Sequence, residues 1–267
     1  MFKLYIDGVH QDILLVSSFP AGESLVRITD PQMICSTSKV SIVWDFKHTK
    51  EVFELMLIVD AIRNIKQYIS IELLLPYLPY ARQDRVCNEG ESYSLKVIGD
   101  VLNSLKFSEV TVWDVHSKKA FDVVNGLKNQ PQKKAFDLVK MKYNIVNPTI
   151  VFPDAGAALK ATDFNCKKIF AEKKRDPLTG KLEGFKILNA DDINPDEDLY
   201  IVDDICDGGG TFIGVANELK KYTTGKIYLY VTHCIASKGF KVFDNVIDKV
   251  YTANAMCEQD EKLLTVK

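Results

Sequence analysis

The most informative stretch of this sequence is Ile201-Val202-Asp203-Asp204-Ile205-Cys206-Asp207-Gly208-Gly209-Gly210-Thr211. An apolar run that leads into carboxylates and glycines is typical of a buried strand followed by a turn and a helix. Glycine lets the backbone approach an anion closely, and the N–H groups at a helix start bind phosphate oxygens. Carboxylates suit sugar hydroxyls or a metal ion. The stretch therefore predicts a site for a phosphorylated sugar.

Two better-known phosphate loops do not fit this stretch. A Walker A loop needs Gly-Lys-Ser/Thr, which the sequence lacks, and a dinucleotide fingerprint needs glycine where Ile213 stands. The alternative to a binding site is a tight turn with solvated aspartates, because glycine and aspartate are common turn residues.

The segments around this stretch repeat a strand, turn and helix plan. Apolar residues at helical spacing follow Thr211, and they are Phe212, Val215, Ala216 and Leu219. The next strand is expected at Ile227–Val231. Earlier strands are expected at Thr149–Phe152, Lys168–Ala171 and Leu199–Val202, the last of them ending at Asp203.

The first half of the chain shows the same alternation. Strands are expected at Ser41–Phe46, Ile69–Leu75 and Val110–Val115. Between them, apolar spacing predicts one helix capped by Thr49 and a second that runs from Leu95 to Leu105. Alternating strands and helices favour parallel sheets.

The polar stretch Asn125–Lys134 interrupts the apolar rhythm and is the expected linker. A chain of 267 residues is about twice a typical domain. We therefore expect an α/β protein with two tandem domains, residues 1–133 and 134–267, each with a mostly parallel sheet flanked by helices.

Composition narrows the class of protein. The net charge is −2, so no global field draws the chain to nucleic acid or a membrane, and neither partner is expected. The longest uncharged apolar run, Leu55–Val59, falls far short of the ~20 residues that span a bilayer. The six cysteines lie far apart without a Cys-x-x-Cys pair, which predicts reduced thiols and a cytoplasmic location.

Several ordered segments resemble the ribose-phosphate pyrophosphokinase family, the phosphoribosyl pyrophosphate (PRPP) synthetases. The loop from Asp203 to Thr211 is similar to the ribose-5-phosphate and PRPP signature of type I phosphoribosyltransferase folds. The other segments are Phe19–Glu23, Pro79–Arg85, Trp113–His116, Pro153–Gly156 and Glu172–Arg175. The resemblance implies two tandem phosphoribosyltransferase-type (type I) domains.

The resemblance also implies an activity, a ribose-phosphate diphosphokinase that transfers the diphosphate of ATP to the C1 hydroxyl of ribose 5-phosphate, giving PRPP and AMP. This reaction requires negative charge on the transferred group to be dispersed. By resemblance, Lys173 and Arg175 do this from a mobile loop, and Lys174–Gly184 is a lid over the site. The alternative is a solvated surface run of cations.

By resemblance, the ATP-binding residues are Arg82, Gln83 and His116, with Phe19 and Glu23 contributed by a neighbouring subunit. A homo-oligomer, dimer or hexamer, with an ATP site at the subunit interface is therefore expected. Arg82 could instead pair with Asp84 or Glu89, and Phe19 could be a core or interface aromatic.

The ribose 5-phosphate site implied by the resemblance consists of Asp203, Asp204, Asp207, Gly208, Gly209, Gly210 and Thr211. Because Asp204 neighbours Asp203 on an extended chain, its side chain should start on the opposite face. Mg²⁺ is the implied cofactor, with His116 and Asp154 as the metal-linked residues.

The chain departs from the family pattern at Ala21, Ala157 and Gly208. Threonine is usual where Gly208 stands, so one hydroxyl donor to phosphate is missing. Two other functions remain open. The loop would also serve a phosphoribosyltransferase that consumes PRPP, and a non-catalytic regulatory subunit would bind nucleotide without turnover.

Overall fold

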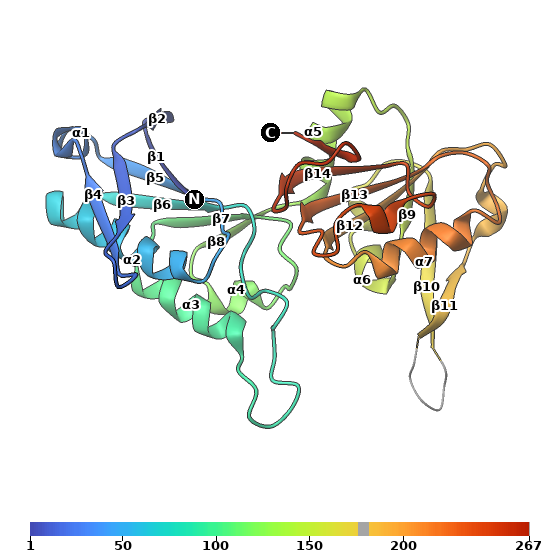
Figure 1. The fold of residues 1–267 in the computed structure, drawn as a ribbon, viewed down its shortest axis with the longest axis horizontal. Helices are drawn as coiled ribbons and strands as arrows, with labels where there is room; N and C mark the ends of the chain where they lie inside the picture. Colours follow the sequence, from blue (N-terminus) through green and yellow to red (C-terminus); the bar gives the residue numbers. More distant parts are fainter. Residues whose placement is uncertain (176–181, 267) are drawn as a thin grey trace. The chain divides into compact units, whose positions relative to one another are not determined.

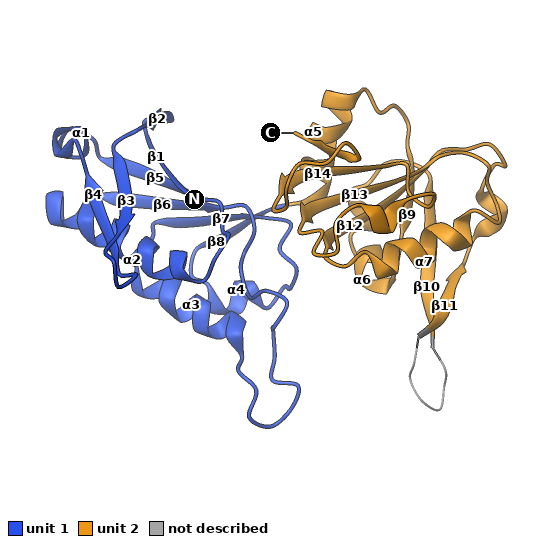
Figure 2. Ribbon diagram, viewed as in Figure 1, with its two compact units in different colours: residues 1–130 blue, residues 131–267 orange. Residues whose placement is uncertain are grey.

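The computed structural model describes residues 1–175 and 182–266, and of Arg175 and Leu182 it describes the backbone only. The chain divides into two compact units, residues 1–130 and 131–267 (Figure 2). Each unit is an α/β structure with its own sheet and core (Figure 1). The division falls between Gln130 and Pro131, inside the stretch expected to be the linker.

Unit 1 consists of β1 (Phe2–Ile6), β2 (Val9–Gln11), β3 (Leu14–Ser18), β4 (Ser24–Ile28), α1 (Pro31–Ser36), β5 (Lys39–Trp44), α2 (Lys50–Ile65), β6 (Ser70–Leu75), α3 (Ser94–Ser104), β7 (Glu109–Trp113), α4 (Ala120–Val123) and β8 (Leu127–Gln130). Its main sheet has the order β2-β1-β5-β6-β7-β8. Strands β5 to β8 run parallel, and β1 pairs antiparallel with both β2 and β5.

The predicted helices of unit 1 pack their apolar faces on this sheet. Leu55, Ile58 and Ile62 of α2 are fully buried, and Leu95 and Leu102 of α3 join the same core. This packing, more than local propensity, stabilises amphipathic helices of this length.

Thr49 takes the N-cap position of α2 as predicted, but its side chain does not cap the helix. Its hydroxyl instead lies 2.9 Å from the hydroxyl of Tyr80. The residue therefore links the start of α2 to the segment that follows β6.

The first 28 residues form two antiparallel pairs that the sequence analysis did not foresee. The β3–β4 hairpin docks on α2 through polar contacts as well as apolar ones. Ser24 Oγ donates to Glu54 Oε1 at 2.8 Å, and Lys50 Nζ donates to Ser18 Oγ at 2.7 Å. Pairing between strands depends on residues distant in sequence, which local periodicity does not reveal.

Unit 2 consists of α5 (Gln132–Tyr143), β9 (Thr149–Phe152), α6 (Ala155–Ala158), η1 (Ala161–Asp163), β10 (Lys168–Arg175), β11 (Leu182–Ile187), η2 (Ala190–Asp192), β12 (Leu199–Cys206), α7 (Gly210–Leu219), β13 (Ile227–Cys234), η3 (Lys241–Phe243), β14 (Lys249–Ala255) and β15 (Leu263–Thr265). Its sheet has the order β11-β10-β9-β12-β13-β14-β15. Only the β10–β11 pair in this described sheet is antiparallel.

Helices α5 and α7 cover opposite faces of this sheet (Figure 1). Along β13, Leu229 and Val231 belong to the core under α7, whereas the ring of Tyr230 lies 4.7 Å from that of Phe136 in α5. Alternate residues of a strand face opposite sides, so both faces of β13 are buried.

Three boundaries differ from the sequence prediction. The expected linker contains β8, which pairs with β7, and the start of α5. Strand β12 continues through both aspartates to Cys206, because its pairing with β13 continues to Cys234. Strand β10 runs on to Arg175 because it pairs with β11.

Candidate functional site

The carboxyl end of β12 concentrates negative charge. Asp203 and Asp204 are consecutive in the strand, and Asp203 Oδ1 accepts the Asp204 N–H at 2.8 Å. Burial raises the pKa of Asp203 well above its usual range, and the carboxylates of Asp204 and Asp154 raise it further. The three acidic groups are therefore close enough to repel one another, and a bound hydroxyl donor or cation would relieve this repulsion.

Among the glycines after β12, Gly209 lies in a turn that other residues do not fit. Gly209 is the N-cap of α7, with a φ of 77°. A Cβ at this position would lie 2.7 Å from the ring of Phe243. No side chain caps α7, so its first N–H groups remain available to an anion beside Thr211.

Asp154 follows β9 and lies between two donors. Its Oδ1 accepts the N–H of Ala157 at 3.1 Å, and its Oδ2 accepts Lys173 Nζ at 2.8 Å. Burial alone would raise the pKa of Asp154, but the hydrogen bonds from Lys173 and from the Ala157 and Gly156 N–H groups lower it. The structure thus brings together two residues predicted for different roles.

Lys173 lies on strand β10, so the expectation that it sits on a loop is wrong. It is paired across the antiparallel hairpin with Phe185 of β11. The ring of Phe185 occupies the space that a side chain at Gly214 of α7 would need. The hairpin that carries Lys173 is therefore packed directly on the helix that follows the glycine loop.

Part of the expected lid lies outside the described residues. Residues 176–181 fall there, and so does the side chain of Arg175. The described part of the expected Lys174–Gly184 lid is strand in β10 and β11.

Sequence analysis did not identify Lys160. Its Nζ lies 3.7 Å from Asp204 Oδ2, and both side chains are largely buried. Asp204 therefore has a cationic neighbour of its own, on the face opposite Asp203. No local pattern links two residues so far apart in the chain.

In unit 1, the segments after β6 and β7 meet through Asp84. Asp84 Oδ2 accepts the hydroxyl of Ser117 at 2.7 Å. This hydrogen bond lowers the pKa of Asp84, partial burial opposes it, and the charges of Lys119, Arg85 and His116 add to the lowering. His116 therefore lies near the Arg82–Asp84 segment, as the two family segments would require.

The predicted ATP residues of this region are accessible. The side chains of Arg82, Gln83 and His116 are exposed. The backbone of Gln83 is fixed, because its N–H donates to Tyr80 O at 3.0 Å and its carbonyl accepts from Leu95 N at 3.2 Å. Asp84 Oδ1 lies 3.4 Å from Arg85 Nε, an ion pair that was not predicted.

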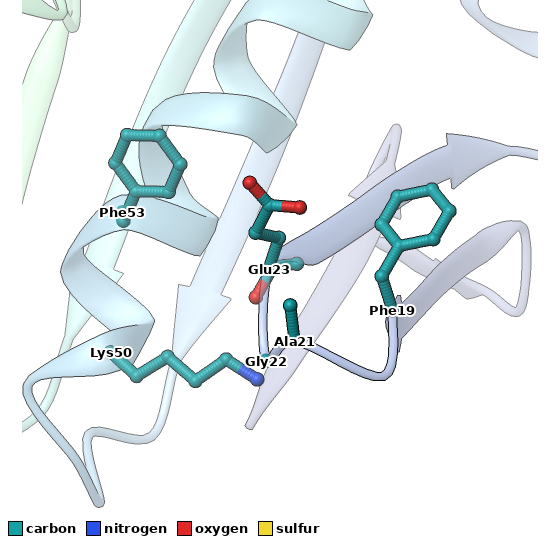
Figure 3. Close-up of a pocket in the computed structure, with 7 residues that line it drawn as sticks. Phe19, Ala21, Gly22, Glu23, Lys50 and Phe53 are labelled. Carbon is teal, nitrogen blue, oxygen red and sulfur yellow. The ribbon is translucent and has the colours of Figure 1, made fainter.

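Phe19 and Glu23 border a surface pocket of about 610 Å³ in unit 1. Figure 3 shows the Glu23 carboxylate between the rings of Phe19 and Phe53, with Lys50 extending from α2 toward Gly22. Phe19 is 52 % exposed and Phe53 58 %, so neither ring is a core residue. Two open rings and a carboxylate suit a planar ligand with a hydrogen-bond donor.

Among the described residues, no group of three or more His, Cys, Asp or Glu side chains could surround a metal ion. Mg²⁺ usually binds through one or two carboxylates, water and substrate phosphates. The oxygens of Asp154 and Asp203 fit that mode of binding. Within the described ranges, no helix is long and apolar enough to cross a membrane.

The acidic and glycine-lined strand end, on this mostly parallel sheet, is the arrangement expected from the resemblance to type I phosphoribosyltransferase folds. Residues 8–105 match the family model described as the N-terminal domain of ribose phosphate pyrophosphokinase. A ribose-phosphate pyrophosphokinase of Mycoplasmopsis pulmonis is 31 % identical over 95 % of this chain and 75 % of its own length. The chain therefore belongs to the ribose-phosphate pyrophosphokinase family, a family of transferases.

Two further comparisons agree. The ribose-phosphate pyrophosphokinase of Pyrococcus furiosus is 27 % identical over 90 % of this chain and 85 % of its own. The crystal structure of a phosphoribosylpyrophosphate synthetase from Mycobacterium smegmatis matches with a TM-score of 0.71 at 20 % identity, over 94 % of this chain and 85 % of that one. The predicted α/β fold with two type I sheets is confirmed.

Proposed function

We propose that this protein transfers the diphosphate of ATP to the C1 hydroxyl of ribose 5-phosphate, producing PRPP and AMP. The observation that carries the proposal is the end of β12, where carboxylates and uncapped N–H groups lie together. A pentose phosphate needs both, because its hydroxyls donate to carboxylates and its phosphate accepts from N–H groups. Membership of the family supplies the reaction.

Ribose 5-phosphate is bound by unit 2. The start of α7, with Gly208, Gly209, Gly210 and Thr211, receives the 5-phosphate, and Thr211 adds a hydroxyl. Asp203 and Asp207 accept the ribose hydroxyls. Asp204 faces Lys160 instead, so its role is to hold the strand end in place.

Lys173 provides the positive charge that the transferred diphosphate requires. In the absence of substrate its ammonium is held by Asp154 at 2.8 Å. A diphosphate carries more negative charge than one carboxylate, so it competes for this ammonium when it binds. Arg175 is proposed for the same work.

ATP is bound by residues of unit 1. Arg82 donates to phosphate oxygens, Gln83 can both donate and accept, and His116 contacts the phosphates or the metal. Phe19 and Glu23 contact the adenine of an ATP molecule that is bound mainly by a neighbouring subunit. The active form is therefore a homo-oligomer. The exposure of both rings of this pocket supports that role.

Mg²⁺ fits the oxygen donors of unit 2, with Asp154 as its carboxylate ligand. When bound, the ion disperses charge on the phosphates. Asp154 keeps acceptor capacity for this, because a carboxylate has about four lone-pair sites and three are in use, by Lys173 and by the N–H groups of Ala157 and Gly156.

The test is to supply ATP, ribose 5-phosphate and Mg²⁺ and to measure AMP and PRPP. Equal amounts of both products are expected. Product formed only from PRPP and a nucleobase would identify a phosphoribosyltransferase. ATP binding without turnover would identify a regulatory subunit. Light scattering on the same sample tests the oligomer, and a fully active monomer would exclude the intersubunit adenine site.

A further inference from the structure

Lys238 lies against the glycine loop of unit 2. If Gly208 carried a Cβ, that atom would lie 3.4 Å from Cε of Lys238, 3.5 Å from Cδ and 3.9 Å from Cγ. The methylene stem therefore runs along the loop backbone. Lys238 follows β13 and precedes η3, so it approaches the loop from a segment other than β12 and α7.

The ammonium group of Lys238 lies close to Gly208 of the glycine loop. Its Nζ is one C–N bond, about 1.45 Å, beyond Cε, so it lies within about 5 Å of the site of a Gly208 Cβ. Lys238 is exposed, and within the described part of the chain its ammonium makes no hydrogen bond or ion pair. By contrast, the lysines at 160 and 173 are each paired with an aspartate of the site.

We infer that Lys238 binds the 5-phosphate of the sugar substrate. This inference rests on the proposed function, since it assigns a further residue to the same site. The carboxylates of Asp203 and Asp207 would lie near a dianionic phosphate bound at this loop, and a nearby cation would offset their repulsion. Lysine, as a flexible point charge, is suited to this contact.

A single Cβ at Gly208 would make only an ordinary van der Waals contact with this stem, so only a larger side chain would interfere with the approach. A threonine, usual at that position in the family, would place its side-chain carbons against the stem of Lys238. Glycine leaves the surface open, so the ammonium of Lys238 replaces the hydroxyl donor that the loop lacks. Lys238 thereby determines the preference for a phosphorylated over an unphosphorylated pentose.

The experiment compares three variants of the full chain. Lys238→Met keeps the apolar stem and removes the charge, Lys238→Arg keeps a charge, and Lys241→Ala removes a nearby exposed lysine as a control. Calorimetry measures the Kd of ribose 5-phosphate, and steady-state kinetics measures KM for both substrates.

We expect Lys238→Met to weaken ribose 5-phosphate binding about tenfold, as for loss of one charge-assisted contact at an exposed site. The KM for ATP and the binding of unphosphorylated ribose should not change. Lys238→Arg should restore most of the affinity, and Lys241→Ala should match the wild type.

Unchanged Kd in Lys238→Met would overturn the inference, and so would equal losses for ribose and ribose 5-phosphate, which would indicate a structural role. Failure of the proposed function is a separate result. A wild-type protein that makes no PRPP, but binds ribose 5-phosphate through Lys238, would refute the reaction and keep the assignment.

Discussion

The strand ends of the two units use the same position in an α/β sheet in different ways. At the end of β12, the backbone supplies the donors, because Gly209 adopts a left-handed conformation and α7 has no side-chain cap. At the ends of β6 and β7, side chains bond to each other, as Ser117 does to Asp84 at 2.7 Å. Val115 N–H is likewise satisfied, by Asn129 Oδ1 at 2.9 Å.

This difference shows how one fold serves two kinds of ligand. Backbone donors around glycine form a small cradle with fixed geometry, which suits a single phosphate. A loop that is held in place by its own side-chain hydrogen bonds keeps exposed groups such as Arg82 and His116 in position, and these groups can contact a larger ligand. This difference is consistent with the proposal that unit 2 binds the acceptor and unit 1 the donor.

The largest effect is expected from Lys173→Ala, because Lys173 of unit 2 is proposed to disperse the negative charge of the transferred diphosphate. Turnover should fall by about a hundredfold, as expected when one transition-state donor is removed. Thermal unfolding should change little, since Asp154 keeps its Ala157 N–H bond. Lys174→Ala is the matched control, because that side chain is 70 % exposed and pairs only at the surface with Glu183. Equal kinetics in the two variants would remove Lys173 from the mechanism.

The second prediction concerns the glycine cradle. Gly209→Ala forces a left-handed residue and a clash with Phe243, so the free energy of unfolding should fall by about 3 kcal/mol. Gly210→Ala, at the first position of α7 with open space around it, should stay within about 0.5 kcal/mol of the wild type. Urea unfolding measures both. Similar losses in both variants would show that helix packing, and not the turn, sets the requirement for glycine.

The third prediction uses the raised pKa of Asp203. The pKa of Asp203 is higher in the folded protein than in the unfolded chain, so the unfolded chain loses this proton at a lower pH. The free energy of unfolding therefore falls as pH rises above about 4. Asp203→Asn should therefore raise the Tm at pH 7, by about 2–4 °C for each 1 kcal/mol relieved. The gain should vanish near pH 4, and activity should drop because a ribose ligand is lost. A Tm gain that is independent of pH would point to packing instead.

The smallest effect is expected in unit 1. Ser117→Ala removes the hydrogen bond that lowers the pKa of Asp84, and the free energy of unfolding at pH 7 should fall by about 1 kcal/mol. A carboxyl group whose pKa is lowered by folding stabilises the folded protein at pH values above its unfolded pKa. This contribution is lost as pH falls through the folded pKa. The two proteins should thus converge in acid. A difference in the free energy of unfolding between the two proteins that stays constant from pH 7 to pH 3 would show that the Ser117 hydrogen bond does not act through the pKa of Asp84.

Periodicity predicted the parallel strands and their helices well. Strand β9 matches the expected Thr149–Phe152, and α7 buries the expected Phe212 and Leu219. These elements were predictable because the residues that make the apolar pattern in the sequence are the residues that the fold buries. The hairpins β1–β2 and β3–β4 were missed because only a few of their residues are buried, and because β1 also pairs with the distant strand β5.

The site was predictable as a set of residue types and not as a set of contacts. The loop chemistry follows from the glycines and aspartates near Gly209, whereas the pairing of Lys173 with Asp154 joins β10 to the segment that follows β9. Lys160 and Lys238 carry no local signal, because isolated lysines are common on surfaces. Only the contacts of their side chains, with Asp204 and with the glycine loop, single them out.

The contact of Phe185 with α7 has a dynamic consequence. Because this ring fills the space above Gly214 and is paired with Lys173, separation of the β10–β11 hairpin would expose the helix beneath it. The two segments should therefore open as one cooperative unit in amide hydrogen exchange. Opening of the helix that follows the glycine loop and displacement of the Lys173 ammonium would then occur in the same fluctuation.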